Sequence, residues 1–264
     1  MVPRRQTRSA GAPAADWRDD AAYAPLRRAD RYFFAWEWLR RDPAYVEAAA
    51  RGVPDPAQFG LAQFVAPATP VPAARPIWLR SLLPAVFRCR LRGGDTAQVF
   101  AALPWPRAEV WTPGCVHCLL SDGLGAVRVD VLEGRFPSQG SELLFEVEGP
   151  AGLGDQLPQL ERLRRLLRHE LPPRGVSARA TRWIAALRVH DALAVGARYR
   201  EIAAVLFGEQ VVGPRWWLDT PSWGLRVQRL AAAANLALRA GPASWLASAA
   251  REAPVRSRAL RDAR

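Results

Sequence analysis

Apolar positions in the last third of the chain recur with the period of an α-helix. Ile184, Leu187 and Leu193 share one face of a first predicted helix, which ends at Gly196. A second helix, with the sequence YREIAAVLF, is predicted to begin three residues later and to end at Gly208. The pattern therefore predicts two short helices separated by a turn.

The second helix has one apolar stripe, while Arg200 and Glu201 are expected to face water. The stripe is formed by Ile202, Ala203, Leu206 and Phe207. A loop then leads to TPSWGLRVQRLAAAANLALRAG, which predicts a third helix. Either Thr220 or Ser222 is suited to cap its start, and Gly241 is suited to close its end.

The third helix separates an apolar arc from a polar set. The arc is formed by Val227, Leu230, Ala231, Ala234 and Leu238. Arg226, Gln228 and Arg229 lie outside it. This division is typical of the recognition helix of a helix-turn-helix, in which arginine can bond guanine and glutamine can bond adenine. An ordinary helical hairpin with a solvated basic face fits the periodicity equally well.

Charge favours the DNA-binding interpretation. The chain carries a formal net charge of +12 and has a sequence pI near 11.1. From Glu161 onward there are 19 Arg against 8 acids, whereas the first 160 residues hold 18 against 17. The absence of lysine suggests GC-rich coding, but that bias does not explain the asymmetry. A basic half beside a balanced half is expected of a phosphate-binding module joined to another domain.

The N-terminal region predicts a flexible basic arm over residues 1–14 and a small helical domain over 15–66. The arm lacks the apolar stretch of a secretory signal. Asp42 followed by Pro43 is a favourable helix start. The aromatic residues of this domain most simply form its core, but Trp36 and Trp38 are also candidates to contact a protein partner.

Residues 67–84 are rich in proline and are expected to form a linker between two domains. Four apolar runs between 85 and 150 then predict antiparallel strands. In one of them, AVRVDVLEG, the valines alternate with Arg128 and Asp130. A basic amphipathic helix is predicted to follow at 157–173. Because the basic excess and the candidate motif lie beyond the linker, residues 85–250 are predicted to form a DNA-binding domain that is β-rich over 85–150 and helical over 151–250. Residues 251–264 are a basic tail.

No combination of residues predicts catalysis or a cofactor. Cys115, His117 and Cys118, with Cys89 earlier, could supply metal ligands, but a second ligand pair is missing. Cys115 and Cys118 should also point to opposite faces of a strand. We therefore expect no metal and no enzyme. Three cysteines and the lack of a membrane-length apolar run fit a cytoplasmic protein.

Four segments carry a resemblance to a known family. They are DWRDDAAYAPLRRADRYFFAWEWLRRDPAY at 16–45, FGLAQF at 59–64, LPQLERLRRLL at 157–167 and RYREIAAVLFG at 198–208. The chain resembles the two-part transcriptional activators of proteobacterial integrative and conjugative elements. These combine a transcriptional-regulator-like N-terminal domain with a DNA-binding-like helix-turn-helix domain.

The resemblance implies sequence-specific binding to double-stranded DNA and activation of excision or transfer genes, with RNA polymerase and a small antiactivator as further partners. Tyr199 to Ile202 match the family's first motif helix, and Trp223 to Leu230 match its reading helix. Arg198 stands where the family tends to have a capping residue, so a capping box with Glu201 is lost. The reading helix continues as AAAANLAL where the family usually carries more arginine.

The expected fold is α+β and mainly helical, with a small helical N-terminal domain, a Pro-rich linker, an antiparallel β region and a helix-turn-helix bundle at 198–240. The expected DNA-contacting residues are Arg198, Arg200, Trp223, Arg226, Gln228 and Arg229, with Arg226 and Arg229 contributing most. We expect residues 85–250 to bind DNA alone, and the protein to associate with the nucleoid. The alternative is an antiactivator-like module that binds a regulator instead of DNA.

Overall fold

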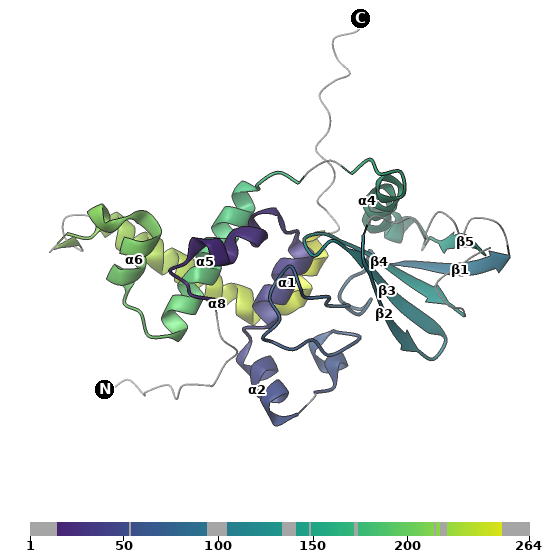
Figure 1. The fold of residues 1–264 in the computed structure, drawn as a ribbon, viewed down its shortest axis with the longest axis horizontal. Coiled ribbons are helices and arrows are strands. Elements are labelled where there is room, and N and C mark those ends of the chain that lie inside the picture. The colour runs from purple at the N-terminus through teal and green to yellow at the C-terminus, as the bar shows by residue number, and fades with distance from the viewer. Residues whose placement is uncertain are drawn as a thin grey trace, which may run out of the picture.

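The computed structural model describes residues 15–249 except 53, 94–104, 134–140, 148, 172–173, 214 and 217–220. The predicted basic arm and basic tail lie outside these residues. Figure 1 shows a five-stranded sheet at one end of the molecule and helices through the middle and the other end. This arrangement confirms the predicted α+β fold class.

The elements follow one another in three groups. The first group contains η1 (Asp20–Arg28), α1 (Arg31–Leu39), α2 (Pro43–Arg51) and η2 (Pro56–Phe59). The sheet contains β1 (Phe87–Gly93), β2 (Arg107–Thr112), β3 (Cys115–Ser121), β4 (Ala126–Leu132) and β5 (Ser141–Glu146). The last group contains α4 (Gly149–Leu167), α5 (Ala178–Ala194), α6 (Tyr199–Phe207), η3 (Glu209–Val211) and α8 (Pro221–Ala249).

Local signals set several of these boundaries as predicted. The Asp42 carboxylate accepts a hydrogen bond of 2.8 Å from the Ala44 amide, and Pro43 occupies the first position of α2. Gly196 has a positive φ of 83° just after α5, and Gly208 has one of 100° at the end of α6. Glycine adopts these angles without a steric penalty, so both helices end where the sequence places them.

The sheet differs from the prediction in one pairing. Its strand order is β2-β3-β4-β1-β5, and β1 runs parallel to β4 while the other neighbours are antiparallel. β2 was not among the predicted strands. A parallel pair needs a crossover connection, and here the chain builds β2 and β3 before β4 returns beside β1. Turn signals identify strand ends but not which distant strands pair.

Both faces of the central strand β4 are buried. Val127, Val129 and Val131 pack against α4 on one face, as the alternating pattern requires. On the other face Arg128 and Asp130 are also buried and lie 2.9 Å apart. The Arg128 guanidinium donates to the Trp78 carbonyl oxygen at 3.2 Å, so the proline-rich segment covers this face of the sheet.

The segment at 67–84 is not a linker between separate cores. It has no helix or strand, as expected, but five of its apolar side chains are buried: Val71, Ala74, Ile77, Trp78 and Leu83. Its backbone carbonyls accept hydrogen bonds from α1 and the residue after it, with Trp36 Nε1 donating to Thr69 and Arg40 Nε donating to Pro67. These bonds take the place of the backbone hydrogen bonds of a helix or sheet, which a proline-rich chain cannot form in full. The segment expected to be a linker is therefore packed against α1 and the sheet.

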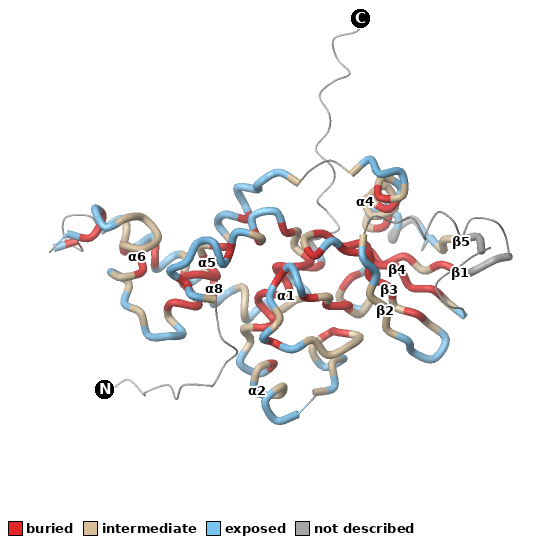
Figure 2. Tube along the Cα trace, in the orientation of Figure 1, coloured by how far each residue is buried: buried red, intermediate tan, exposed pale blue. Residues whose placement is uncertain are grey.

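The aromatic residues of α1 form a core shared with the C-terminal helices. Trp36 and Trp38 are 0% and 2% exposed, so the prediction that they contact a partner is wrong for this fold, and the core interpretation is confirmed. Figure 2 shows this buried region at the centre of the molecule. Trp38 and Phe34 both stack on Trp245, which lies in α8 beyond a kink at Gly241.

A buried ion-pair network joins α1 to α5. Arg41 donates two hydrogen bonds of 2.7 Å to the carboxylate of Asp191 and also pairs with Glu37. Tyr23 donates to the same Asp191 at 2.7 Å. Burial alone would raise the pKa of Glu37, but Arg41 and Arg40 outweigh burial, so that pKa lies below its ordinary value.

This network bears on the predicted domain boundary. A fragment of residues 85–250 would lack Tyr23 and Arg41, so Asp191 would lose both of these partners, and the surfaces of α5 and α8 that pack on η1 and α1 would be exposed. The structure therefore does not support the expectation that this fragment acts alone.

Among the described residues, no helix is long and apolar enough to cross a membrane.

Replacing Asp191 by Asn should lower the free energy of unfolding by about 3–5 kcal/mol, because Arg41 loses its bidentate partner in a buried site. Urea denaturation of the full chain measures the change. The matched control is Glu47→Gln, which breaks the exposed Arg51–Glu47 pair and should change stability by less than about 1 kcal/mol. Equal unfolding midpoints for the two variants would contradict this account.

Replacing Trp38 by Ala should destabilise the protein by about 3–5 kcal/mol, since the ring is fully packed against α5 and α8. Thermal unfolding should show a strongly lowered Tm. Trp111→Ala is the control, because that ring is 55% exposed. An unchanged melting curve for Trp38→Ala would restore the interpretation of Trp38 as a contact residue.

Candidate nucleic-acid interface

The helices α5, α6 and α8 pack around one apolar cluster, to which the N-terminal segment contributes Trp17. The cluster contains Trp17, Val189, Ala192, Ile202, Ala203, Val211, Val212, Trp216, Val227 and Ala231. The observed bounds of α6 are those that the sequence predicts. α8 begins at Pro221, which suits the first helical position, so Ser222 lies inside the helix and does not cap it. Thr220 lies outside the described residues.

The predicted division of α8 into two faces is confirmed by burial. Val227, Ala231 and Ala234 are buried, and Leu230 and Leu238 are partly buried against the same cores. Arg226, Gln228 and Arg229 are all exposed. The first half of α8 thus presents polar side chains to solvent from a helix held firmly by its opposite face.

A groove of about 410 Å³ runs between α5, the end of α6 and α8. Arg226 and Arg229 line it from α8, and Thr181 and Arg182 line it from α5. Arg182 was not among the predicted contact residues. It is exposed and lies two residues before Ile184 on α5. Helical periodicity shows which side of a helix faces water, but not which other helix lies beside it.

Two aromatic rings position the Arg226 side chain. The guanidinium carbon of Arg226 lies 4.6 Å from the ring centroid of Phe207 and 5.4 Å from that of Trp223. The two rings are themselves 4.9 Å apart. Contacts between a guanidinium and aromatic faces are favourable and reduce the freedom of the side chain. Arg226 is therefore partly ordered before any ligand arrives.

The other predicted residues lie elsewhere on the three helices. Arg198 precedes α6 and makes no side-chain hydrogen bond that caps the helix, as expected of a residue that cannot form a capping box with Glu201. Arg200 is exposed and donates to the Val212 carbonyl oxygen at 3.2 Å. Gln228 is exposed but does not line the groove. The fold thus brings Trp223, Arg226 and Arg229 together, and leaves Arg198 and Arg200 at the start of α6.

The electrostatics of this surface differ from those of α4. No acidic residue occurs from Pro221 to Ala249. Within the described part of the chain, Arg182, Arg226 and Arg229 have no carboxylate partner. On α4, by contrast, Arg164 and Arg165 both pair with Glu161 at 2.7 Å. Nearby carboxylates therefore offset part of the charge of Arg164 and Arg165, whereas the arginines of the groove leave positive charge available to an anionic ligand.

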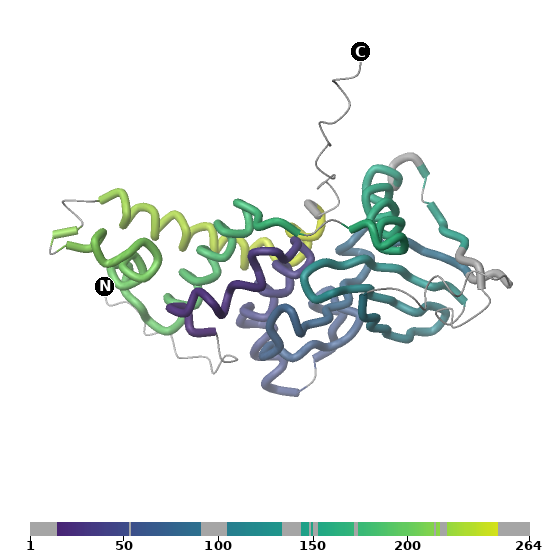
Figure 3. Tube along the Cα trace, turned by 45° about the horizontal axis from the view of Figure 1, so that its top comes forward, coloured from purple at the N-terminus to yellow at the C-terminus, as the bar shows by residue number. Residues whose placement is uncertain are grey.

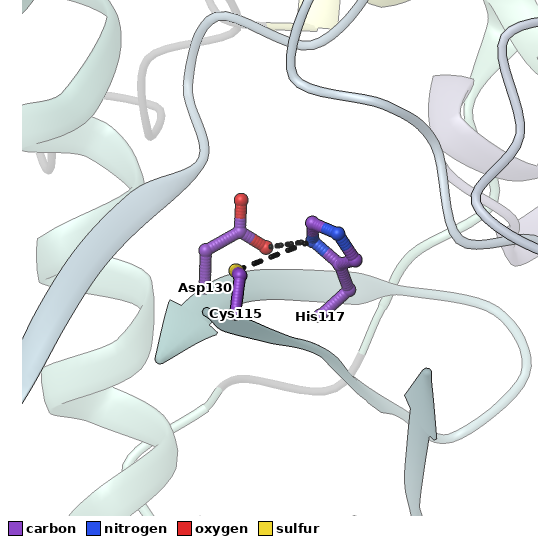
Figure 4. A group of neighbouring side chains, drawn as sticks. All are labelled: Cys115, His117 and Asp130. Carbon is purple, nitrogen blue, oxygen red and sulfur yellow. Dashed lines mark hydrogen bonds and ion pairs between the residues drawn. The ribbon is translucent and has the colours of Figure 1, made fainter. Parts of the chain in front are cut away.

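A second cluster lies on the polar face of the sheet (Figure 4). His117 Nδ1 is 2.8 Å from Asp130 Oδ1 and 3.7 Å from Cys115 Sγ, and Asp130 also pairs with Arg128. Burial raises the pKa of Cys115 to about 11. Cys118 lies in the apolar core on the opposite face, as predicted. The guanidinium already neutralises Asp130, so we regard this cluster as structural, and the absence of a metal stays a prediction.

Comparisons with known proteins assign both ends of the chain. Residues 16–65 match the family model of the proteobacterial transcriptional regulator-like domain. Residues 149–256 match the model described as T6SS, transcription factor, DNA-binding domain. The second match contains α4, α5, α6 and α8. No curated protein matches the chain.

The chain is therefore a DNA-binding transcription factor of two parts. It joins a transcriptional-regulator-like domain to a transcription factor DNA-binding domain, which is the organisation that the sequence resemblance implies. The arginine-lined groove lies within the matched DNA-binding domain.

If the rings position Arg226 for DNA, their effects should depend on that arginine. Phe207→Leu keeps an apolar side chain but removes the ring, and should weaken DNA binding less than Arg226→Ala does. In the double variant, Phe207→Leu should add little further loss, because its effect acts through Arg226. Fluorescence anisotropy on each variant measures the cycle. Fully additive losses would show that Phe207 does not act through Arg226.

Proposed function

We propose that α6 and α8 form a helix-turn-helix and that α8 enters the major groove of DNA. The observation that carries this proposal is the groove lined by Arg182, Arg226 and Arg229 within the matched DNA-binding domain, where these arginines have no carboxylate partner among the described residues. Its arginines are exposed and the opposite face of α8 is buried, which is the geometry that a recognition helix needs.

Each side chain then has a distinct role. Arg226 and Arg229 are placed to bond guanine edges or phosphates, and Gln228 to bond adenine. Arg182 approaches from α5 and adds a phosphate contact. Arg198 and Arg200 flank the start of α6, where a helix N-terminus favours anions.

The regulatory role follows from the resemblance. The protein acts as a non-enzymatic activator of excision or transfer genes of a mobile element, in the cytoplasm at the nucleoid, with RNA polymerase and an antiactivator as partners. Genes for an integrase, an excision factor or conjugation beside its own gene would support this role. A reporter fused to their promoters would test activation directly.

A second candidate function is binding to another regulator through α8. Leu225 and Leu236 are 45% and 62% exposed on this helix, and apolar residues on a helix surface suit a helix–groove contact. Salt separates the two functions. The logarithm of DNA affinity falls linearly with the logarithm of salt concentration, whereas an apolar contact hardly responds to salt.

Replacing Arg226 or Arg229 by Ala should each cost about 1–3 kcal/mol of DNA-binding free energy. If the arginine reads a base, its substitution should relax sequence specificity at one position of the DNA site. If it contacts a phosphate, its substitution should lower the affinity for all DNA sequences evenly. The measurement is selection of the preferred site from genomic fragments by the full chain, followed by titration of each variant.

The control for these titrations is Arg164→Ala, which removes an arginine of α4 that is paired with Glu161 and Glu170. It should bind as tightly as the parent protein. Unchanged affinity in both Arg226→Ala and Arg229→Ala would refute the assignment of α8 as the reading helix.

A further inference from the structure

The N-terminal segment packs on the helices of the candidate interface. Trp17 is 2% exposed and belongs to the apolar cluster of α5, α6 and α8, about 170 residues away in sequence. The buried Arg188 of α5 donates from Nε to the Trp17 carbonyl oxygen at 2.9 Å and from Nη2 to that of Arg18 at 3.2 Å. The backbone at these two residues is therefore fixed to α5.

This attachment places the Arg18 side chain at the first turn of α6. Its guanidinium pairs with Glu201 through Nη2 and lies 4.4 Å from the centroid of the Trp17 ring. Nη1 of the same group is 4.0 Å from Asp16. Figures 1 and 3 show the purple N-terminal segment lying along α5 and close to α6. A residue of the part matched by the regulator-like model thus pairs with a residue of the matched DNA-binding part.

Glu201 is the only acidic residue in the sequence of α6. It lies one turn after Arg198 and next to Arg200, which are both exposed and flank the end of α6 proposed to meet anions. It precedes Phe207, which lines the groove, by six residues, or about 9 Å along the helix axis. Exposed charges interact over about 10 Å in 0.1 M salt, so the Glu201 carboxylate is close enough to affect both surfaces.

A carboxylate at this place opposes DNA unless its charge is offset. The Glu201 side chain is 42% exposed, so a phosphate that meets the start of α6 can approach it. Two like charges 4 Å apart in water repel each other by a free energy equivalent to about a fivefold change in an equilibrium constant. The Arg18 guanidinium supplies the opposite charge, and the pair as a whole repels a phosphate much less than Glu201 alone.

We propose that Arg18 of the regulator-like part supports DNA binding by offsetting the charge of Glu201 at the start of α6. This inference rests on the proposed function, because it places a duplex against α6 and α8. Arg18 acts on DNA through Glu201, while Trp17 and Arg188 hold it in place. The DNA interface then draws on both parts of the chain, although only the C-terminal part matches a DNA-binding model.

The test is a charge cycle on the full-length protein, with Arg18→Ala, Glu201→Gln and the double variant. Fluorescence anisotropy at about 0.1 M salt measures the affinity of each for the selected DNA site. Arg18→Ala leaves the Glu201 charge without its offset and should bind about fivefold more weakly. Glu201→Gln alone should bind at least as tightly as the parent protein. The double variant has the same local charge as the parent pair and should return to the parent affinity.

Arg51→Ala is the matched control, because it removes one arginine from another exposed pair with a glutamate in the regulator-like part. That pair lies on α2, which Figure 1 shows apart from α6. The control lowers the net charge by the same amount as Arg18→Ala and should keep the parent affinity. The melting curves of both variants should match that of the parent protein, since exposed ion pairs add little to stability.

Unchanged affinity in Arg18→Ala would overturn the inference. An equal loss in Arg51→Ala would also overturn it, because net charge alone would then explain the effect. A double variant that binds as weakly as Arg18→Ala would do the same, since Arg18 would then act by direct contact or through folding instead of through Glu201. Failure of the parent protein to bind any DNA would instead refute the proposed function, and this inference with it.

Discussion

The buried pairing of Arg41 with Asp191 is the constraint on which the rest of the structure depends. Two charges removed from water are tolerated only when each meets a well-placed partner. The bidentate geometry, with Tyr23 and Glu37 completing the network, therefore holds α1 against α5 in one arrangement. The regulator-like part and the DNA-binding part become one packed body.

α8 extends this coupling to the candidate interface. Its first half is held by the cluster of α5 and α6, and the segment beyond Gly241 returns Trp245 and Leu246 to the core around α1. A helix with its two ends in different cores is positioned by both. The regulator-like part is thus part of the scaffold that sets the orientation of the arginines on α8.

Charge acts through placement as much as through amount. Arg164 and Arg165 carry the same formal charge as Arg226 and Arg229, but the first two pair with Glu161, and Arg164 also pairs with Glu170, whereas α8 contains no acidic residue. The charge asymmetry of the sequence pointed to the half of the chain that contains the matched DNA-binding domain. It did not distinguish arginines that stabilise a helix from arginines that leave positive potential at the surface.

The sequence by itself determined what short-range physics controls. Glycines with positive φ ended α5 and α6, Asp42 and Pro43 started α2, and periodicity separated the buried from the exposed face of α8. Only the tertiary structure decided the parallel pairing of β1 with β4, the burial of Trp36 and Trp38, the packing of 67–84, the position of Arg182 in the groove, and the attachment of Trp17 beside α6. Each of these depends on which distant segment lies alongside, and local periodicity carries no information about that choice.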